Sequence, residues 1–161
     1  MNEKVAEISL REITPENLEE ILALDVAPEQ KTFVSSAAYA LAQAYVHKEN
    51  AFPFGVYAGD VPVGFIMFGF YRARNQFTLW KFFIDKAHQN KGCGRAALLL
   101  GMDIMARDHG AKELYTGVAL GNEVAERLYK SVGFRLTGLE ENGMKELKYV
   151  FDGGAEEYGG Q

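Results

Sequence analysis

Residues 77–105 constrain the fold of this chain more than any other stretch. Residues 77–84 are aromatic and apolar, residues 85–91 are polar, and a Gly92-Cys93-Gly94 turn opens an apolar run that continues to Met105. The first part predicts a buried strand and the last part a helix. The first amides of a helix have no partner inside it and carry partial positive charge, and glycines let a ligand approach the backbone. The stretch therefore predicts an anion site, most simply for phosphate.

Three glycine-rich phosphate motifs can be compared with this turn. The ATP/GTP loop needs a Gly-Lys-Ser/Thr ending that the chain lacks. The dinucleotide fingerprint fits Gly92 to Ala97, but a polar loop separates Ile84 from Gly92 and no acid ends the next strand. The third motif, Gln/Arg-x-x-Gly-x-Gly/Ala, is matched in full from Gln89 to Gly94. Here Gln89, Lys91 and Arg95 would add donors and positive charge.

On this third motif the chain resembles the GNAT superfamily of acetyl-CoA-dependent N-acetyltransferases. A second stretch, residues 122–134, strengthens the resemblance, because Asn122, Leu128-Tyr129 and Gly133-Phe134 fall on the positions of a second family motif. The resemblance spans nearly the whole chain. It implies an enzyme with acetyl-CoA (CoA) as co-substrate and no metal, acting on a small-molecule amine.

The resemblance also implies a role for individual residues. Tyr129 would be catalytic, as the general acid that protonates the departing thiolate, and a backbone N–H near Ile84 would stabilise the oxyanion. Asn122 would contact the pantetheine arm. The full set of implied cofactor contacts is Phe83, Ile84, Asp85, Gln89, Asn90, Lys91, Gly92, Cys93, Gly94, Arg95, Asn122 and Tyr129.

Each of these residues also has a simpler interpretation. Asn122 would cap any helix that follows it, and Tyr129 lies on an apolar helix face where core tyrosines are common. Lys91 and Arg95 could be solvated charges. Cys93 has no accompanying His and acid that would make it a nucleophile. The histidines lie in unrelated segments without metal-ligand spacing.

The pattern along the chain predicts an α/β (α+β) protein of order βααβββαβαββ, with a mixed, mostly antiparallel central sheet flanked by helices. Thr14-Pro15 predicts the start of the first helix, as N-cap and first helical residue. Residues 50–53 predict the end of the second helix, with a strand starting at Phe54. We expect one domain over residues 1–152 and a loose Gly-rich, acidic tail over 153–161.

The acceptor is less constrained than the cofactor. The chain looks most like bacterial spermine/spermidine and diamine acetyltransferases, through Leu24-Asp25-Val26, Glu29-Gln30 and 82–85. Acids dominate residues 3–29, and Asp25 and Glu29 lie in the break between two helices, so both are candidates to bind a polyamine such as spermidine. The pattern departs at Trp80, followed by Lys81, where several polyamine acetyltransferases carry an acid. A carboxylate base from this strand is therefore missing.

Composition limits the remaining classes. The 161 residues carry a net charge of −5, which argues against a nucleic-acid partner, and no apolar run suits a membrane span. One cysteine allows no internal disulfide, which favours a cytoplasmic location. GNAT proteins often dimerise, so the resemblance leaves a homodimer open. The alternatives are acetylation of an aminoglycoside, an amino acid or a protein amine, and an acetyl-CoA-binding module without catalysis.

Overall fold

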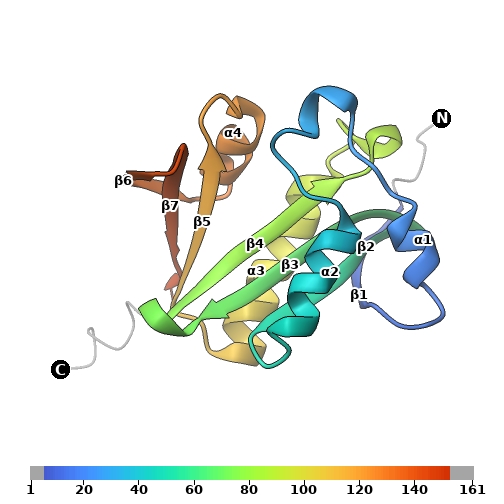
Figure 1. The fold of residues 1–161 in the computed structure, drawn as a ribbon, viewed down its shortest axis with the longest axis horizontal. Helices are drawn as coiled ribbons and strands as arrows, with labels where there is room; N and C mark the ends of the chain where they lie inside the picture. Colours follow the sequence, from blue (N-terminus) through green and yellow to red (C-terminus); the bar gives the residue numbers. More distant parts are fainter. Residues whose placement is uncertain (1–5, 153–161) are drawn as a thin grey trace.

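The computed structural model describes residues 6–152, and its elements follow the predicted order βααβββαβαββ (Figure 1). The first half contains β1 (Ile8–Glu12), α1 (Leu18–Leu22), the 3-10 turn η1 (Pro28–Gln30), α2 (Ala37–Val46), β2 (Ala51–Ala58) and β3 (Val61–Tyr71). The second half contains η2 (Arg72–Arg74), β4 (Gln76–Ile84), η3 (Lys86–His88), α3 (Cys93–His109), β5 (Glu113–Ala119), α4 (Glu123–Ser131), β6 (Arg135–Glu141) and β7 (Met144–Val150). The predicted tail, 153–161, lies outside the described residues.

All seven strands described join one sheet in the order β1-β2-β3-β4-β5-β7-β6. Every neighbouring pair is antiparallel except β4 and β5, which run parallel. The predicted mixed, mostly antiparallel sheet is therefore confirmed. A parallel pair needs a crossover, and α3 supplies it between β4 and β5.

Helices cover both faces of the sheet, and each face has its own hydrophobic core. On one face α1 and α2 bury Ile21, Ala37 and Ala40 against the sheet. On the other face α3 and α4 bury a larger core that includes Leu98 and Tyr129. In Figure 1 α2 crosses in front of the central strands and α3 behind them. The central strand β4 contributes side chains to both cores, so it links the two halves of the interior.

A β-bulge interrupts the pairing of β4 with β3. Met67 pairs with Lys81 and the next residue, Phe68, pairs with Leu79, so Trp80 is the extra residue. A bulge changes the direction of the side chains around it. Trp80 packs against the core beneath α1 and α2, and Lys81 reaches Ser35 just before α2, while Leu79 and Phe82 belong to the opposite core. Two consecutive side chains of β4 therefore lie toward α2.

The first helix begins later than the sequence predicts. Thr14 does not cap it, because Asn17 occupies the N-cap position and α1 begins at Leu18. The Asn17 Oδ1 atom accepts a hydrogen bond of 2.8 Å from the Thr14 N–H, and its amide donates to the Glu12 carbonyl. Asparagine stabilises such a turn in competition with the helix. The predicted first turn of helix is therefore a separate turn.

Strand β2 begins three residues before the predicted start at Phe54. Ala51, Phe52 and Pro53 all pair with β3. Proline has no N–H to donate, so it is tolerated in a strand only where one side lacks a partner. Pairing with β1 begins at Phe54, so Pro53 lies where β2 has a neighbour on one side only. The expectation that residues 50–53 precede the strand was wrong.

Candidate active site

The site lies where the parallel strands β4 and β5 separate. They pair only at Thr78 with Tyr115 and Leu79 with Thr116. Beyond these residues β4 stays paired with β3 up to Ile84, and β5 stays paired with β7 up to Ala119. The two strands diverge in Figure 1, with α4 beside β5 and the η3 turn beyond β4. The edge of β4 that faces this gap has no strand partner beyond Leu79.

A cavity of about 430 Å³ fills the gap. Its walls come from β4, β5, the start of α3, α4 and the loop after η1. It brings together most of the residues predicted to bind the cofactor: Phe83, Ile84, Gln89, Asn90, Gly92, Gly94, Arg95, Asn122 and Tyr129. Asp85, Lys91 and Cys93 are not among the lining residues. Asp85 caps the η3 turn through the Ala87 N–H, and Cys93 is buried in the core.

The N-terminus of α3 opens on this cavity. Gly92 precedes the helix with φ of 81°, a left-handed conformation that a glycine adopts without strain. No side chain caps the helix, and Arg95 in its first turn lines the cavity. Helix amides that lack a side-chain cap, next to a guanidinium, suit a phosphate group. These residues fit the pyrophosphate portion of CoA.

Gln89 has a different use from the one predicted. Its amide nitrogen donates to the Ile84 carbonyl at 2.9 Å and to Gln30 Oε1 at 2.7 Å. Both donors are thus engaged within the protein, so the prediction of an extra donor toward an anion is not supported. The amide instead joins the end of β4 to the η1 turn. Gln89 therefore shapes the cavity by fixing the loop that forms its wall.

The backbone of β4 directs an N–H donor toward the gap. The Asp85 N–H donates to the Val63 carbonyl of β3 at 2.8 Å. Because successive amides of a strand point in opposite directions, the Ile84 N–H points away from β3 and toward the gap. The Gln89 amide reaches the Ile84 carbonyl on that same side, in agreement with this direction. Ile84 therefore presents the backbone donor that was predicted for an oxyanion.

Asn122 lines the cavity and also caps α4. Its Oδ1 atom accepts a hydrogen bond of 3.4 Å from the Ala125 N–H. The amide nitrogen of the side chain is not used in that bond, so it can donate to a ligand while the oxygen caps the helix. The two interpretations of Asn122 from sequence are compatible.

Tyr129 lies at the base of the cavity, near the end of α4. Its side chain is only 8% exposed, and its ring packs 5.7 Å from that of Phe134. Burial raises the pKa of Tyr129 to about 12, against a smaller opposing effect of a hydrogen bond with Thr116. The phenol is therefore protonated throughout the neutral range, as a proton donor must be.

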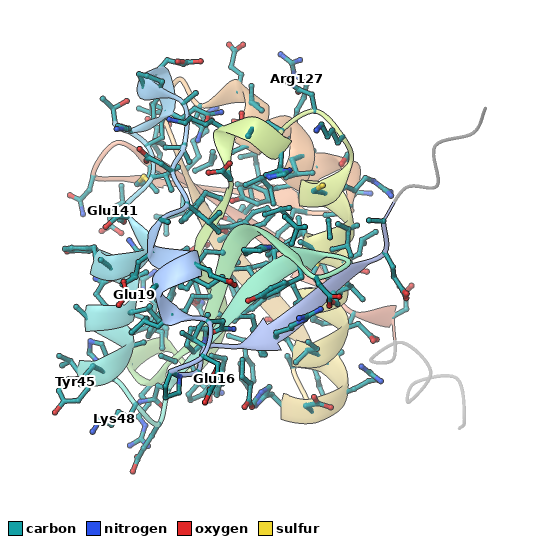
Figure 2. All side chains as sticks on the ribbon, turned by 90° about the vertical axis from the view of Figure 1, so that its right-hand side faces the viewer. Glu16, Glu19, Tyr45, Lys48, Arg127 and Glu141 are labelled. Atoms are coloured by element: carbon teal, nitrogen blue, oxygen red, sulfur yellow. The ribbon has the colours of Figure 1, made fainter. Side chains whose placement is uncertain are left out.

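The two predicted substrate residues lie outside the cavity. Asp25 forms an ion pair of 3.1 Å with Lys31, which lowers the pKa of its carboxyl group. Glu29 is exposed on η1. Glu7, Glu12, Glu16, Glu19 and Glu20 are exposed as well, and Figure 2 shows Glu16 and Glu19 on the outside near α1. Neither is among the lining residues, although Asp25 Oδ1 accepts a hydrogen bond of 2.9 Å from the N–H of Val26 in the cavity wall, so the role of both acids stays a prediction.

Sequence reasoning missed a second cavity, of about 400 Å³, beside the first. It lies between β4, β5 and the β6–β7 hairpin. Four residues line both cavities: Trp80, Thr116, Gly117 and Met144. Glu141 and Glu146 line only the second, and Arg74 of η2 lies 3.7 and 3.8 Å from their carboxylates. The sequence does not indicate these acids, because they lie on a β-hairpin that matches no functional motif.

Comparison with known proteins agrees with this geometry. The model of the acetyltransferase (GNAT) family matches residues 16–134. A probable spermine N(1)-acetyltransferase of Bacillus subtilis subsp. natto is 32% identical to this chain, and the match covers 87% of this chain and 96% of the relative's length. The spermine/spermidine N(1)-acetyltransferase of Bacillus subtilis strain 168 is 31% identical over the same shares.

Solved structures with the same fold include enzymes bound to CoA. The PaiA N-acetyltransferase of Thermoplasma acidophilum, in complex with coenzyme A, has a TM-score of 0.70 at 19% identity and covers 90% of this chain and 99% of its own. The spermidine N-acetyltransferase of Vibrio cholerae, in complex with CoA and spermine, has a TM-score of 0.71 at 19% identity, with coverage of 89% and 95%. At such identities these structures establish the fold.

The chain belongs to the GNAT family of acetyltransferases. It is an enzyme of the N-acetyltransferase type, and the family uses acetyl-CoA. Within residues 6–152, no cluster of three or more His, Cys, Asp and Glu side chains could hold a metal ion. Of the helices described, none is long and apolar enough to cross a bilayer.

Proposed function

We propose that this enzyme transfers the acetyl group of acetyl-CoA to a primary amine of a polyamine or diamine, by direct attack in a ternary complex. The observation that carries the proposal is the junction of two cavities across β4 and β5. One cavity offers helix and strand amides to the donor, and the other carries two carboxylates. The spermine acetyltransferases among its relatives support the same acceptor class.

On the donor side, recognition relies on the backbone. The amides at the start of α3, with Arg95, would hold the pyrophosphate. The free edge of β4 would pair with the pantetheine amides, as an added strand does. Asn122 would donate its side-chain amide to the same arm. The Ile84 N–H would stabilise the negative charge that develops on the carbonyl oxygen during attack.

Tyr129 would assist departure of the thiolate. A phenol with a pKa of about 12 is a weaker acid than a thiol, whose ordinary value is about 8.5. Tyr129 would therefore act first as a hydrogen-bond donor to the sulfur. It would regain its proton from the attacking nitrogen, which must lose one when the amide forms. The bond from nitrogen to carbon forms, the carbon–sulfur bond breaks, and the products are an N-acetylamine and a free thiol.

On the acceptor side, charge would hold the distal ammonium groups. Glu141 and Glu146 are the acids among the lining residues of the second cavity, which also include Arg74 and Lys145. We propose them, beside Asp25 and Glu29, as contacts of a long cationic acceptor. Arg74 pairs with both acids from distances of 3.7 and 3.8 Å, so an incoming ammonium would compete with its guanidinium.

The decisive experiment mixes the protein with acetyl-CoA and spermidine and follows release of the CoA thiol. Fast release that requires the amine is expected, and the same assay without amine is the control. A panel of an aminoglycoside, free amino acids and a lysine peptide tests the other acceptors. Turnover of one of these without turnover of spermidine would move the enzyme to that class. Binding of acetyl-CoA without turnover of any amine would indicate a binding module.

The remaining parts of the proposal concern location and assembly. The single cysteine, Cys93, is buried and unpaired, which fits a reducing compartment such as the cytoplasm. We propose a homodimer only because GNAT proteins often dimerise. Sedimentation at several protein concentrations would test it.

A further inference from the structure

The reacting nitrogen must lose a proton before it attacks, and the first cavity contains no carboxylate that could take it. None of its lining residues is Asp or Glu. The charged and titratable side chains on its walls are Lys81 of β4, His88 of η3, Arg95 of α3 and Tyr129 of α4. From α2, Tyr39 faces Lys81 with its ring, and β3 places Met67 opposite it.

Lys81 is held in a defined position on this wall. The bulge at Trp80 directs it toward α2, where its Nζ atom donates a hydrogen bond of 2.8 Å to Ser35 Oγ. The Nζ atom also lies 5.5 Å from the centre of the Tyr39 ring. In the part of the chain that the structure describes, burial lowers the pKa of Lys81 and no carboxylate opposes this shift. Lys81 and Ser35 both line the cavity, so the positive charge of Lys81 acts on a ligand there and is not neutralised by a paired carboxylate of the described residues.

Given the proposed amine acetyltransferase function, we infer that Lys81 replaces the missing base: its fixed positive charge disfavours the ammonium form of the reacting group and so supplies the neutral amine. A cation placed beside a titrating amine is an established way to activate it. The proton leaves to solvent before attack, so no protein side chain need accept it. Distal ammonium groups of the acceptor lie in the second cavity and are not affected in this way.

The expected size of the effect follows from distance. Because Lys81 lines the cavity of about 430 Å³, we take about 7 Å as the separation of its Nζ atom from the reacting nitrogen. A like charge at about that distance, at an effective dielectric constant of about 20, lowers the pKa of an amine by about one to two units. Burial also lowers the pKa of Lys81 itself. A neutral Lys81 would offer a second mechanism, in which its amine takes the proton directly.

The test is the pH dependence of kcat, which reports ionisations in the enzyme–substrate complex, measured at a saturating concentration of whichever amine of the acceptor panel is turned over best. In Lys81→Met the midpoint of the acidic limb is expected to rise by about one pH unit. Lys81→Arg keeps the charge and should retain the midpoint within a few tenths. Lys86→Met removes a lysine of η3 that does not line the cavity and should change nothing. Thermal melts confirm that each variant is folded.

Two outcomes would overturn the inference. An unchanged midpoint in folded Lys81→Met removes the electrostatic role, and an Arg variant that behaves like the Met variant assigns Lys81 as the base. Failure of spermidine alone leaves this test intact, because it is run with the amine that works.

A second readout, inhibition measured at one pH against the amine that is turned over, does not depend on the titration of that amine. Butyltrimethylammonium keeps its charge at every pH and should inhibit Lys81→Met about tenfold more strongly than the wild type, whereas 1-pentanol should inhibit both equally. Equal inhibition constants for the cation in the two proteins would contradict a repulsive field at the site.

Discussion

The two sides of β4 offer different kinds of group to a ligand. On the side of α3 and α4, the cavity is built from glycines, helix amides and the free edge of a strand. On the side of α2 and the β6–β7 hairpin, the groups that face a ligand are side chains: Lys81, Glu141 and Glu146. Backbone groups are the same whatever side chains the segment carries, whereas side-chain groups change with every substitution.

This difference decides what a sequence reveals. Backbone recognition requires glycine at fixed spacing, so it leaves a short pattern such as residues 89–94. Side-chain recognition depends on which residues the fold brings together, so it leaves none. The predictions below change one side at a time, starting with the largest expected effect.

Removing the phenol oxygen of Tyr129 tests the donor side most severely. Tyr129→Phe should reduce kcat about 10²-fold, because it removes the proton donor while keeping the packed ring. The KM for the amine should change little. Tyr149→Phe is a matched control, since Tyr149 packs on Phe134 from the other side and does not line the cavity. A loss below threefold at saturating amine would remove the role of the hydroxyl.

The burial of the same phenol predicts the alkaline behaviour of the enzyme. A proton donor fails above its pKa, and burial raises the pKa of Tyr129 to about 12. The kcat of the wild type should therefore show no descending limb below about pH 10, the ordinary pKa of tyrosine. A descending limb centred near pH 8 would assign the essential acid to another group.

A methyl group at Gly94 tests backbone recognition. Its Cβ would lie at ordinary van der Waals distances, 3.6 Å from Ile84 and 3.8 Å from Leu128, so the protein can accommodate it. Gly94→Ala should keep or raise the Tm, because alanine favours the helix, and should raise the KM for acetyl-CoA about tenfold by blocking close approach. Gly110→Ala, at the left-handed C-cap of α3 with φ of 67°, should lower the Tm but leave the KM for acetyl-CoA unchanged, which separates stability from recognition. Unchanged affinity would mean that no ligand approaches this turn.

Charge on the hairpin tests the acceptor side. Arg74→Gln should lower the KM for spermidine about two- to fivefold, because an exposed ion pair is weak and its loss frees both acids. Glu146→Gln should raise that KM by a similar factor but leave the KM for butylamine unchanged. Arg72 lies in the same η2 turn as Arg74 but pairs with Glu49, so Arg72→Gln should have no effect. Equal effects on mono- and polyamines would contradict a distal contact.

The smallest effect concerns the ion pairs of Glu126, which join α4 to β7. Glu126 of α4 pairs with Lys130 at 2.8 Å and with Lys145 of β7 at 2.7 Å, and these partners lower its pKa to about 2. The stabilisation is present above pH 4.5 and is lost as the pH falls through about 2. Glu126→Gln should lower the Tm slightly at pH 7 and not at pH 2. Glu123→Gln, at a looser pair with Arg127, is the comparison.

The fold was largely predictable because its signals are local. Alternating strands, an Asn-Gly hairpin and the glycine turn before α3 each determine their own segment. The errors came from competition: Asn17 displaced Thr14 as the cap of α1, and Pro53 entered β2 where only one neighbour exists. The acceptor side needed tertiary information. The bulge that directs Lys81 toward Ser35 arises from pairing with β3, and nothing near Lys81 in the sequence indicates it.

The bulge has one more consequence. Trp80 is the single tryptophan of the chain, and it lines both cavities at their junction. Its indole packs edge-on to His47, with ring centres 5.9 Å apart, on the outer side. All tryptophan fluorescence of the protein therefore originates at the point where donor and acceptor would meet. The unlabelled enzyme carries its own optical probe, and stopped-flow emission could time the arrival of each ligand separately.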